Sequence, residues 1–170
     1  MIDGLSIHHD WIGVDDETKL LELIGGPGRP ARTVERNRIE RFGPGVAGTG
    51  YATGQRVELA IPPHLEALAK RLSDEGVMTA DAISVNWYLP GQFMRPHVDR
   101  AQAGDVIPIL SLAGSCVMRF LPVGKGELCW FECPPRTLVI MAGAARWQYK
   151  HEILPVSEPR ASIVFRRAKP

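Results

Sequence analysis

The stretch RPHVDR, Arg95 to Arg100, places a histidine and an aspartate two positions apart, behind a proline. On an extended strand, side chains two positions apart project from the same face, so His97 and Asp99 could bind one metal ion together. The stretch HHD, residues 8–10, has the same spelling. The motif therefore needs support from the rest of the chain.

His151 is the candidate for a third ligand. It follows Asp99 by 52 residues (151 − 99), in RWQYKHEIL, a stretch with the pattern of a strand. We expect the strands of His97 and His151 to face each other across the interior of an antiparallel barrel. Two imidazoles and one carboxylate form the ligand set of non-haem Fe(II) sites. Three other histidines have no such partner and are interpreted as terminal-strand or solvated residues: His8, His9 and His64.

The last strand-like stretch, RASIVFR, carries two arginines. Arg160 and Arg166 are six residues apart, an even number, so both project from one strand face. At about 3.3 Å per residue, their Cα atoms are about 20 Å apart. Arginine pairs with carboxylates in bidentate fashion, so the two could hold a small dicarboxylic acid, with Ser162 as an added donor. The alternative is a solvated edge strand, which we prefer for Arg167 and Lys169.

The first half of the chain, residues 1–80, predicts two helices, a basic strand and a loop. One helix starts at Asp15 and ends at paired glycines, and the other begins at Pro62 and Pro63. A strand is expected through Arg41. The Gly- and Thr-rich stretch 43–55 is predicted to be a loop that covers a site.

The second half, residues 81–170, reads as a succession of antiparallel strands. Seven short apolar or alternating runs are each bounded by Gly, Pro or small polar residues: AISVNWYL, VIPILSLAG, CVMRFLPV, ELCWFEC, RTLVIMAG, RWQYKHEIL and RASIVFRR. The sequence therefore predicts one α+β domain over residues 1–170. It would be a sandwich or open barrel with the N-terminal helices packed on one sheet.

Composition and charge limit the class of protein. The 170 residues carry a net charge of +1 and are 45% hydrophobic, which argues against strong whole-surface attraction to nucleic acid or membrane. No apolar run approaches the roughly 20 residues that span a bilayer, and the start lacks a signal-peptide pattern. Cys116, Cys129 and Cys133 are interpreted as core thiols rather than a disulfide framework or zinc site. We expect a cytoplasmic monomer that is not bound to membranes.

Seven features occur in one order between about Ser84 and Arg166. They are NWY at 86–88, PG at 90–91, HVD at 97–99, SLAG at 111–114, RTLVIMAGAAR at 136–146, the late histidine and R-x5-R. In this order and spacing the chain resembles the AlkB family of Fe(II)- and 2-oxoglutarate-dependent dioxygenases. The N-terminal half is similar to that family only in layout.

The resemblance implies a fold, a metal and two cosubstrates. The fold would be a double-stranded β-helix, or jelly roll, with Fe(II) bound by His97, Asp99 and His151. Asn86 and Tyr88 would contact 2-oxoglutarate, Arg160 would pair with its distal carboxylate, and Arg166 would lie near the metal. With O2 as second cosubstrate, such enzymes hydroxylate C–H bonds, and an oxidised N-methyl group is lost as formaldehyde.

The substrate stays open between alkylated DNA or RNA and a protein side chain or small molecule. Base-repairing members of the family carry acidic residues just after HxD, where this chain has Arg100-Ala101-Gln102. A flipped base needs a stacking platform, for which the candidates are Phe42, Tyr51 and Trp147. The basic stretch from Arg29 to Arg41 could contact phosphates, but its interleaved glutamates also fit a solvated strand face.

Two further points remain open from the sequence. Arg119 and Met141 would contact substrate if they faced the mouth of the barrel, and otherwise belong to the surface and the core. A metal-free binding module of cupin type is an alternative from another class. The complete triad and the arginine pair argue against it.

Overall fold

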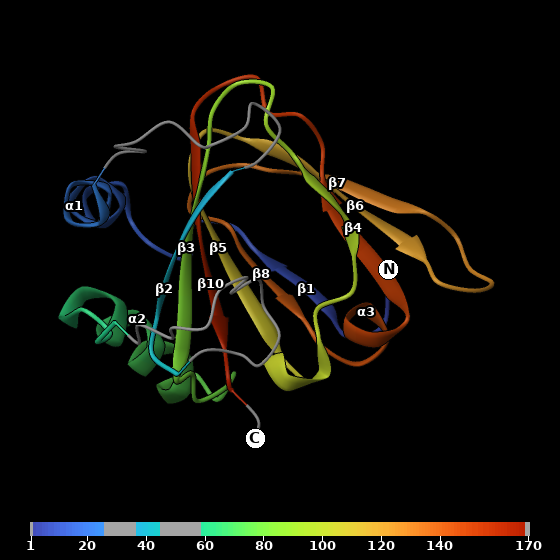
Figure 1. Cartoon of the computed structure of the whole chain (residues 1–170), viewed down its shortest axis with the longest axis horizontal. Helices are drawn as coiled ribbons and strands as arrows, with labels where there is room; N and C mark the ends of the chain where they lie inside the picture. Colours follow the sequence, from blue (N-terminus) through green and yellow to red (C-terminus); the bar gives the residue numbers. More distant parts are fainter. Residues whose placement is uncertain (1, 26–36, 45–58, 169–170) are drawn as a thin grey trace, which may run out of the picture.

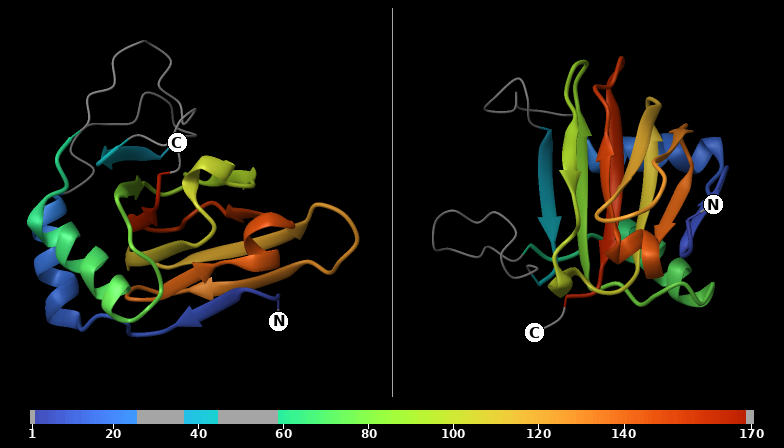
Figure 2. Two further views of the ribbon diagram at one scale, coloured as in Figure 1. Left: turned by 90° about the horizontal axis from the view of Figure 1, so that it is seen from below. Right: turned by 90° about the vertical axis from the view of Figure 1, so that its right-hand side faces the viewer.

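The computed structural model describes residues 2–25, 37–44 and 59–168 (Figure 1). Two antiparallel sheets lie against each other, and two helices cover the outside of the larger sheet (Figure 2). The expected helix of residues 15–24 is α1 (Val14–Ile24), and the proline-started helix is α2 (Pro63–Asp74). The helices pack on one sheet as the sequence predicts, and the architecture is the double-stranded β-helix that the resemblance implies.

The larger sheet has six strands in the order β1-β8-β5-β10-β3-β2. Their bounds are β1 (Leu5–His8), β8 (Leu138–Met141), β5 (Ile107–Ala113), β10 (Arg160–Arg166), β3 (Ala82–Tyr88) and β2 (Arg38–Phe42). The smaller sheet has the order β4-β9-β6-β7. Its strands are β4 (Met94–His97), β9 (Tyr149–Ile153), β6 (Cys116–Pro122) and β7 (Cys129–Cys133).

Strand alternation divides the apolar residues into two layers. In β10, Ala161, Ile163 and Phe165 face the helices and pack with Leu65 and Leu72 of α2. The opposite face of the larger sheet meets the smaller sheet in a second cluster that includes Ile109, Met118 and Phe120. Because side chains alternate along a strand, residues 160, 162, 164 and 166 share the face toward the smaller sheet. This face carries the candidate 2-oxoglutarate-binding residues Arg160, Ser162 and Arg166.

One of the predicted strands is partly helical in the structure. RWQYKHEIL was expected to be a strand throughout, but Arg146 and Trp147 belong to a short helix, α3 (Gly143–Trp147). Gly143 starts this helix with φ of +46°, which glycine adopts without steric cost. The side chain of Arg146 is buried among carbonyl groups, so tertiary contacts override the local strand pattern.

Several other expectations concern the N-terminal half and the cysteines. The basic strand ends as predicted in β2, but residues 26–36 and 45–58 lie outside the described structure, and with them Arg29, Tyr51 and most of the expected loop. Cys116 and Cys133 are buried, directly opposed on β6 and β7, and form no disulfide, as expected for core thiols, whereas Cys129 is only partly buried. Within the described ranges, no helix has the length and apolar character needed to span a bilayer.

Candidate functional site

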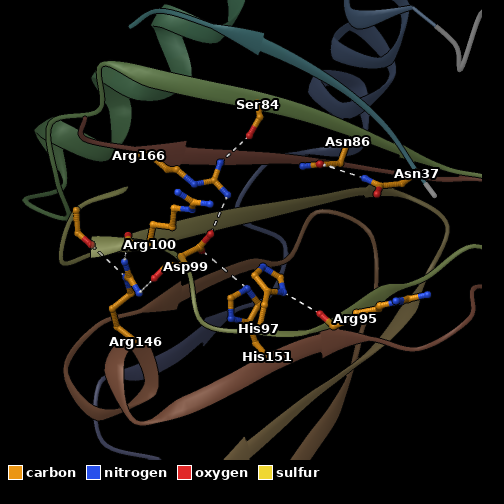
Figure 3. Close-up of polar contacts among 11 residues, drawn as sticks. Asn37, Ser84, Asn86, Arg95, His97, Asp99, Arg100, Arg146, His151 and Arg166 are labelled. Carbon is orange, nitrogen blue, oxygen red and sulfur yellow. Dashed lines mark hydrogen bonds and ion pairs between the residues drawn. The ribbon is translucent and has the colours of Figure 1, made fainter. Parts of the chain in front are cut away.

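His97 and His151 are neighbours in the smaller sheet. They are directly opposed in the β4–β9 ladder, with ring centroids 4.3 Å apart. The expectation that their strands face each other across the barrel is wrong, because the two strands are hydrogen-bonded side by side. Asp99 follows β4, and the three side chains present ligand atoms within 4.8 Å of one another (Figure 3).

The histidine rings are held in a state suited to metal binding. Nδ1 of His97 lies 2.8 Å from the carbonyl oxygen of Arg95. A carbonyl only accepts, so Nδ1 carries a proton, and Nε2 is the nitrogen that faces the other ligands and is left for a metal. Burial lowers the pKa of His151 to about 3, and the neighbouring His97 acts in the same direction. His151 is therefore neutral, as a ligand must be.

The Asp99 carboxylate is ionised although it is largely buried. Burial alone would raise the pKa of Asp99, but Arg166, His151 and His97 together bring it below its usual value. Nη2 of Arg166 lies 3.3 Å from Oδ1, while Oδ2 faces Nε2 of His151 at 3.9 Å. Nη1 of Arg166 also donates to the Ser84 hydroxyl at 2.7 Å. Arg166 thus holds a metal-ligating side chain, while its buried Nε has no hydrogen-bond partner among the described residues.

Ser84 was not singled out in the sequence, although a signal for it exists. In AISVNWY it alternates with Asn86 and Tyr88 and so shares their strand face. The structure places all three along the wall of one cavity. Its position opposite Val164 on β10, two residues from Arg166, explains the contact with that arginine.

A cavity of about 360 Å³ lies beside the triad, between the two sheets. The larger sheet supplies its wall through β2, β3, β5 and β10, and the smaller sheet through β4, β6 and β9. The lining residues include Ile39, Arg41, Phe42, Asn86, Tyr88, Met94, Arg100, Met118, Ser162 and Val164. The volume lies within the range of small-molecule sites.

Arg160 is not itself among the cavity-lining residues but lies against Tyr88 of the cavity wall, and it is almost wholly buried, with 1% of its surface exposed. Its guanidinium sits 5.2 Å from the centroid of the Tyr88 ring, and Nη2 donates to the Ser111 hydroxyl at 3.1 Å. Within the part of the chain that the structure describes, its Nε and Nη1 groups have no hydrogen-bond partner. A buried charged group with unmet donors is costly unless an anion completes it, so the geometry fits a carboxylate-bearing ligand.

The remaining candidates lie away from the triad. Met141 is fully buried in the core, and Arg119 pairs with Glu152 at 2.6 Å outside the cavity wall, so neither contacts substrate at the mouth. Trp147 is not among the cavity-lining residues, whereas Phe42 is. The other histidines lie elsewhere: His8 is 3.3 Å from Ser6, His9 is 3.2 Å from Thr137, and His64 is in the first turn of α2.

Comparison with known proteins identifies relatives. Residues 36–167 match the family model of the 2OG-Fe(II) oxygenase superfamily. The chain is 30% identical to the uncharacterized protein L905 of Acanthamoeba polyphaga mimivirus, covering 97% of this chain and 85% of that protein. It is 27% identical to the tRNA (carboxymethyluridine(34)-5-O)-methyltransferase ALKBH8 of Mus musculus, over 89% of this chain but only 24% of that protein. It is 22% identical to the DNA N6-methyl adenine demethylase of Caenorhabditis elegans, covering 98% and 60%.

The fold is shared with a solved structure, that of OsALKBH1. The two superpose with a TM-score of 0.71 at 15% identity, over 98% of this chain and 99% of the other. At this identity the likeness concerns the fold alone. The fold likeness, the match to the family model and the His-Asp-His cluster therefore agree with one another.

Proposed function

The chain belongs to the 2OG-Fe(II) oxygenase superfamily and is an AlkB-like, Fe(II)- and 2-oxoglutarate-dependent oxygenase, and from this premise we propose that it oxidises an alkyl group on a nucleic-acid base. The membership disfavours the cupin-like binding module. When bound, Fe(II) with 2-oxoglutarate and O2 supplies the oxidation of a C–H bond, with 2-oxoglutarate ending as succinate and carbon dioxide. The protein binds, orients and excludes water.

The donor set at the triad fits Fe(II). Two neutral imidazoles and one ionised carboxylate are the ligands of non-haem Fe(II) oxygenases, which leave the remaining positions open. We infer that His97, Asp99 and His151 hold the metal, and that they are the residues whose loss abolishes turnover. Arg166 keeps Asp99 charged and oriented toward the histidines.

The buried Arg160 carries the proposal for the cosubstrate. Two of its donors have no partner among the described residues, and its guanidinium lies against Tyr88, at the opposite end of β10 from Arg166. A dicarboxylate spanning from the metal toward Arg160 would satisfy both donors in bidentate fashion. This is the single observation on which the 2-oxoglutarate orientation rests.

Three further side chains are proposed to contact 2-oxoglutarate. Asn86, Tyr88 and Ser162 all line the cavity between Arg160 and the triad, and Ser162 is directly opposed to Asn86 in the β10–β3 ladder. Tyr88 and Ser162 offer hydroxyl groups and Asn86 an amide. The Asn86 oxygen also accepts a hydrogen bond from Asn37 at 3.2 Å, which ties the segment before β2 to this wall (Figure 3).

The cavity mouth supports a nucleic-acid substrate. Phe42 and Ile39 of β2 supply apolar walls, and Arg41 and Arg100 supply cations at the same cavity. A base in a duplex cannot reach so small a site, so the substrate would be single-stranded or flipped out of its stack. Phe42 is then the stacking platform, while the arginines contact phosphates. Two relatives have names that refer to a nucleic acid, tRNA in one case and DNA in the other, and this supports the same class of substrate.

One observation favours a second candidate, a protein side chain or small molecule. The residue after Asp99 is the exposed Arg100, where base-repairing relatives of the resembled family carry acidic residues. A cation at this place suits an acidic peptide or carboxylate-bearing small molecule as well as a phosphate.

The deciding experiment measures succinate and formaldehyde release with three substrate classes. The purified protein with Fe(II) and 2-oxoglutarate is given single-stranded DNA or RNA with N-methylated bases, N-methylated peptides, and small N-methyl amines. We expect turnover above the substrate-free rate only with the oligonucleotides, and none with His97→Ala. Turnover confined to peptides or amines would overturn the nucleic-acid proposal and leave the oxygenase assignment intact.

A further inference from the structure

Arg146 makes a set of contacts around the segment that follows the HxD motif (Figure 3). Its Nε donates to the carbonyl oxygen of Gly104 at 3.1 Å, Nη1 to that of Asp99 at 2.9 Å, and Nη2 to that of Arg100 at 2.7 Å. Each guanidinium nitrogen thus has a main-chain acceptor. The three acceptors bracket a single 3₁₀ turn, η1 (Ala101–Ala103).

This arginine is buried, with 2% of its surface exposed, and its guanidinium lies 4.1 Å from the centroid of the Trp147 ring. Burial lowers the pKa of Arg146, and Asp99 and Asp105 act in the opposite direction. A buried cation that donates to three carbonyls is expensive to keep unless its geometry serves a purpose. The contacts fit the fork of a guanidinium, which an ammonium group cannot reproduce.

The position of Arg146 in the chain links two metal ligands. α3 leads after Gln148 into β9, so Arg146 and His151 are five residues apart on one continuous stretch. The segment that it holds begins at Asp99, which lies beyond the end of β4 and outside the β4–β9 ladder. The ladder places the two histidines but not the carboxylate. Arg146 supplies the missing tie between the aspartate and the stretch that carries His151.

We propose that Arg146 is a positioning residue, which places the Asp99 carboxylate against the two histidines before any metal binds. The inference rests on the metal triad assigned above. Arg146 is not among the residues that line the cavity, and it acts through the main chain of Asp99. It differs from Arg166, which bonds the Asp99 carboxylate itself.

The test is Co(II) binding without oxygen, followed by the visible absorption bands that report ligand number and geometry. Two variants separate the donor geometry of the guanidinium from its charge: Arg146→Lys keeps the positive charge, and Arg146→Met removes it. The matched control is Arg136→Met, which removes another structural arginine. Arg136 pairs with Asp10 at 2.9 Å and Glu17 at 3.1 Å, and none of the three lines the cavity.

We expect Arg146→Lys to weaken Co(II) binding about 10-fold and Arg146→Met up to about 100-fold, the range seen when an outer partner of a metal ligand is lost. Both should shift the absorption bands, and Arg136→Met should lower Tm without changing affinity or bands. Wild-type bands and affinity in both Arg146 variants, with only Tm lowered, would overturn the proposal. Wild-type Co(II) affinity and bands in Arg146→Lys alone would also overturn the proposal, because the positive charge, and not the three hydrogen bonds of the guanidinium, would then support the site.

The same titration separates failure of this inference from failure of the metal assignment. His97→Ala should lose the Co(II) bands altogether. If His97→Ala kept them, the ligand assignment itself would be wrong, whatever Arg146 does. Should Arg146→Met fail to fold, Arg146→Lys still decides, since it retains the charge and nearly all of the volume.

Discussion

His97 and His151 are directly opposed partners in the β4–β9 ladder, and their ring centroids lie 4.3 Å apart. Main-chain hydrogen bonds of the sheet therefore fix two of the three metal ligands relative to each other. Asp99 lies outside this ladder, and its carboxylate depends on contacts from Arg166 and its main chain on contacts from Arg146. The site is thus two preset imidazoles and one carboxylate that arginines hold in place.

Metal binding should stabilise the fold through these ligands. Co(II) at about 100 times its Kd is expected to raise the free energy of unfolding by about 2.7 kcal/mol, because the unfolded chain lacks the site. His151→Ala should remove the shift in Tm, while His64→Ala, in the first turn of α2, should keep it. Thermal denaturation with and without Co(II) checks this. A full shift in His151→Ala would contradict the ligand assignment.

Arg160→Met should separate cosubstrate binding from metal binding. Loss of two charge-assisted hydrogen bonds, about 1.5–3 kcal/mol each, predicts an increase of at least about 100-fold in KM for 2-oxoglutarate. The Co(II)-induced Tm shift should stay, because Arg160 contacts Tyr88 and Ser111 rather than a metal ligand. Arg119→Met, on the outside of the smaller sheet, is the control and should leave KM unchanged. An unchanged KM in Arg160→Met would place the distal carboxylate elsewhere.

Tyr88 should make the protein less stable in strong alkali. Burial raises its pKa from 10.0 to about 12, although Arg160 acts in the opposite direction. Between these values the folded state keeps the phenol proton while the unfolded state releases it. The contribution of Tyr88 to the free energy of unfolding is therefore complete below pH 10 and is lost as the pH rises to 12. The loss is about 3 kcal/mol at most, at about 1.4 kcal/mol per pKa unit.

The matching measurement is chemical denaturation across this alkaline range for the wild type and Tyr88→Phe. The variant should show a shallower decline, because phenylalanine has no proton to lose. Ultraviolet titration of the three tyrosines should likewise lose its late component. Identical slopes in the two proteins would refute the assignment of this pH dependence to Tyr88.

Arg100 should contribute to the affinity for single-stranded nucleic acid. Arg100→Glu is expected to weaken binding of a methylated oligonucleotide and reduce the slope of log K against log salt by about one. Fluorescence anisotropy at several salt concentrations measures both. Lys125→Glu, an exposed residue between β6 and β7, is the control for a general charge effect. Equal losses in both variants would show a general charge effect and would contradict a specific contact from Arg100.

Much of the site could be predicted because strand periodicity is local. The spacing of His97 and Asp99, and of Arg160, Ser162 and Arg166, predicted one face for each set. In the structure His97, Asp99, Ser162 and Arg166 line one cavity, and the regular ladders of β10 put Arg160 on the same strand face as Ser162. That Arg166 pairs with a substrate carboxylate stays a prediction: its Nη groups contact Asp99 and Ser84, and its Nε has no hydrogen-bond partner among the described residues. The local spacing predicts that Arg166 faces inward, but it cannot predict that the Asp99 carboxylate lies within hydrogen-bond distance of Arg166.

The sequence by itself determined the class of fold, the ligand residues and the residues that face the interior, because alternation and motif order are properties of the chain. Only the tertiary structure decided that β4 and β9 are neighbours and that Arg146 leaves the expected strand to hold the segment after Asp99. It also decided that two donors of Arg160 have no partner among the described residues. Each of these depends on strand pairing or on the burial of a charge between segments far apart in sequence. Their energies arise only when both sheets are assembled.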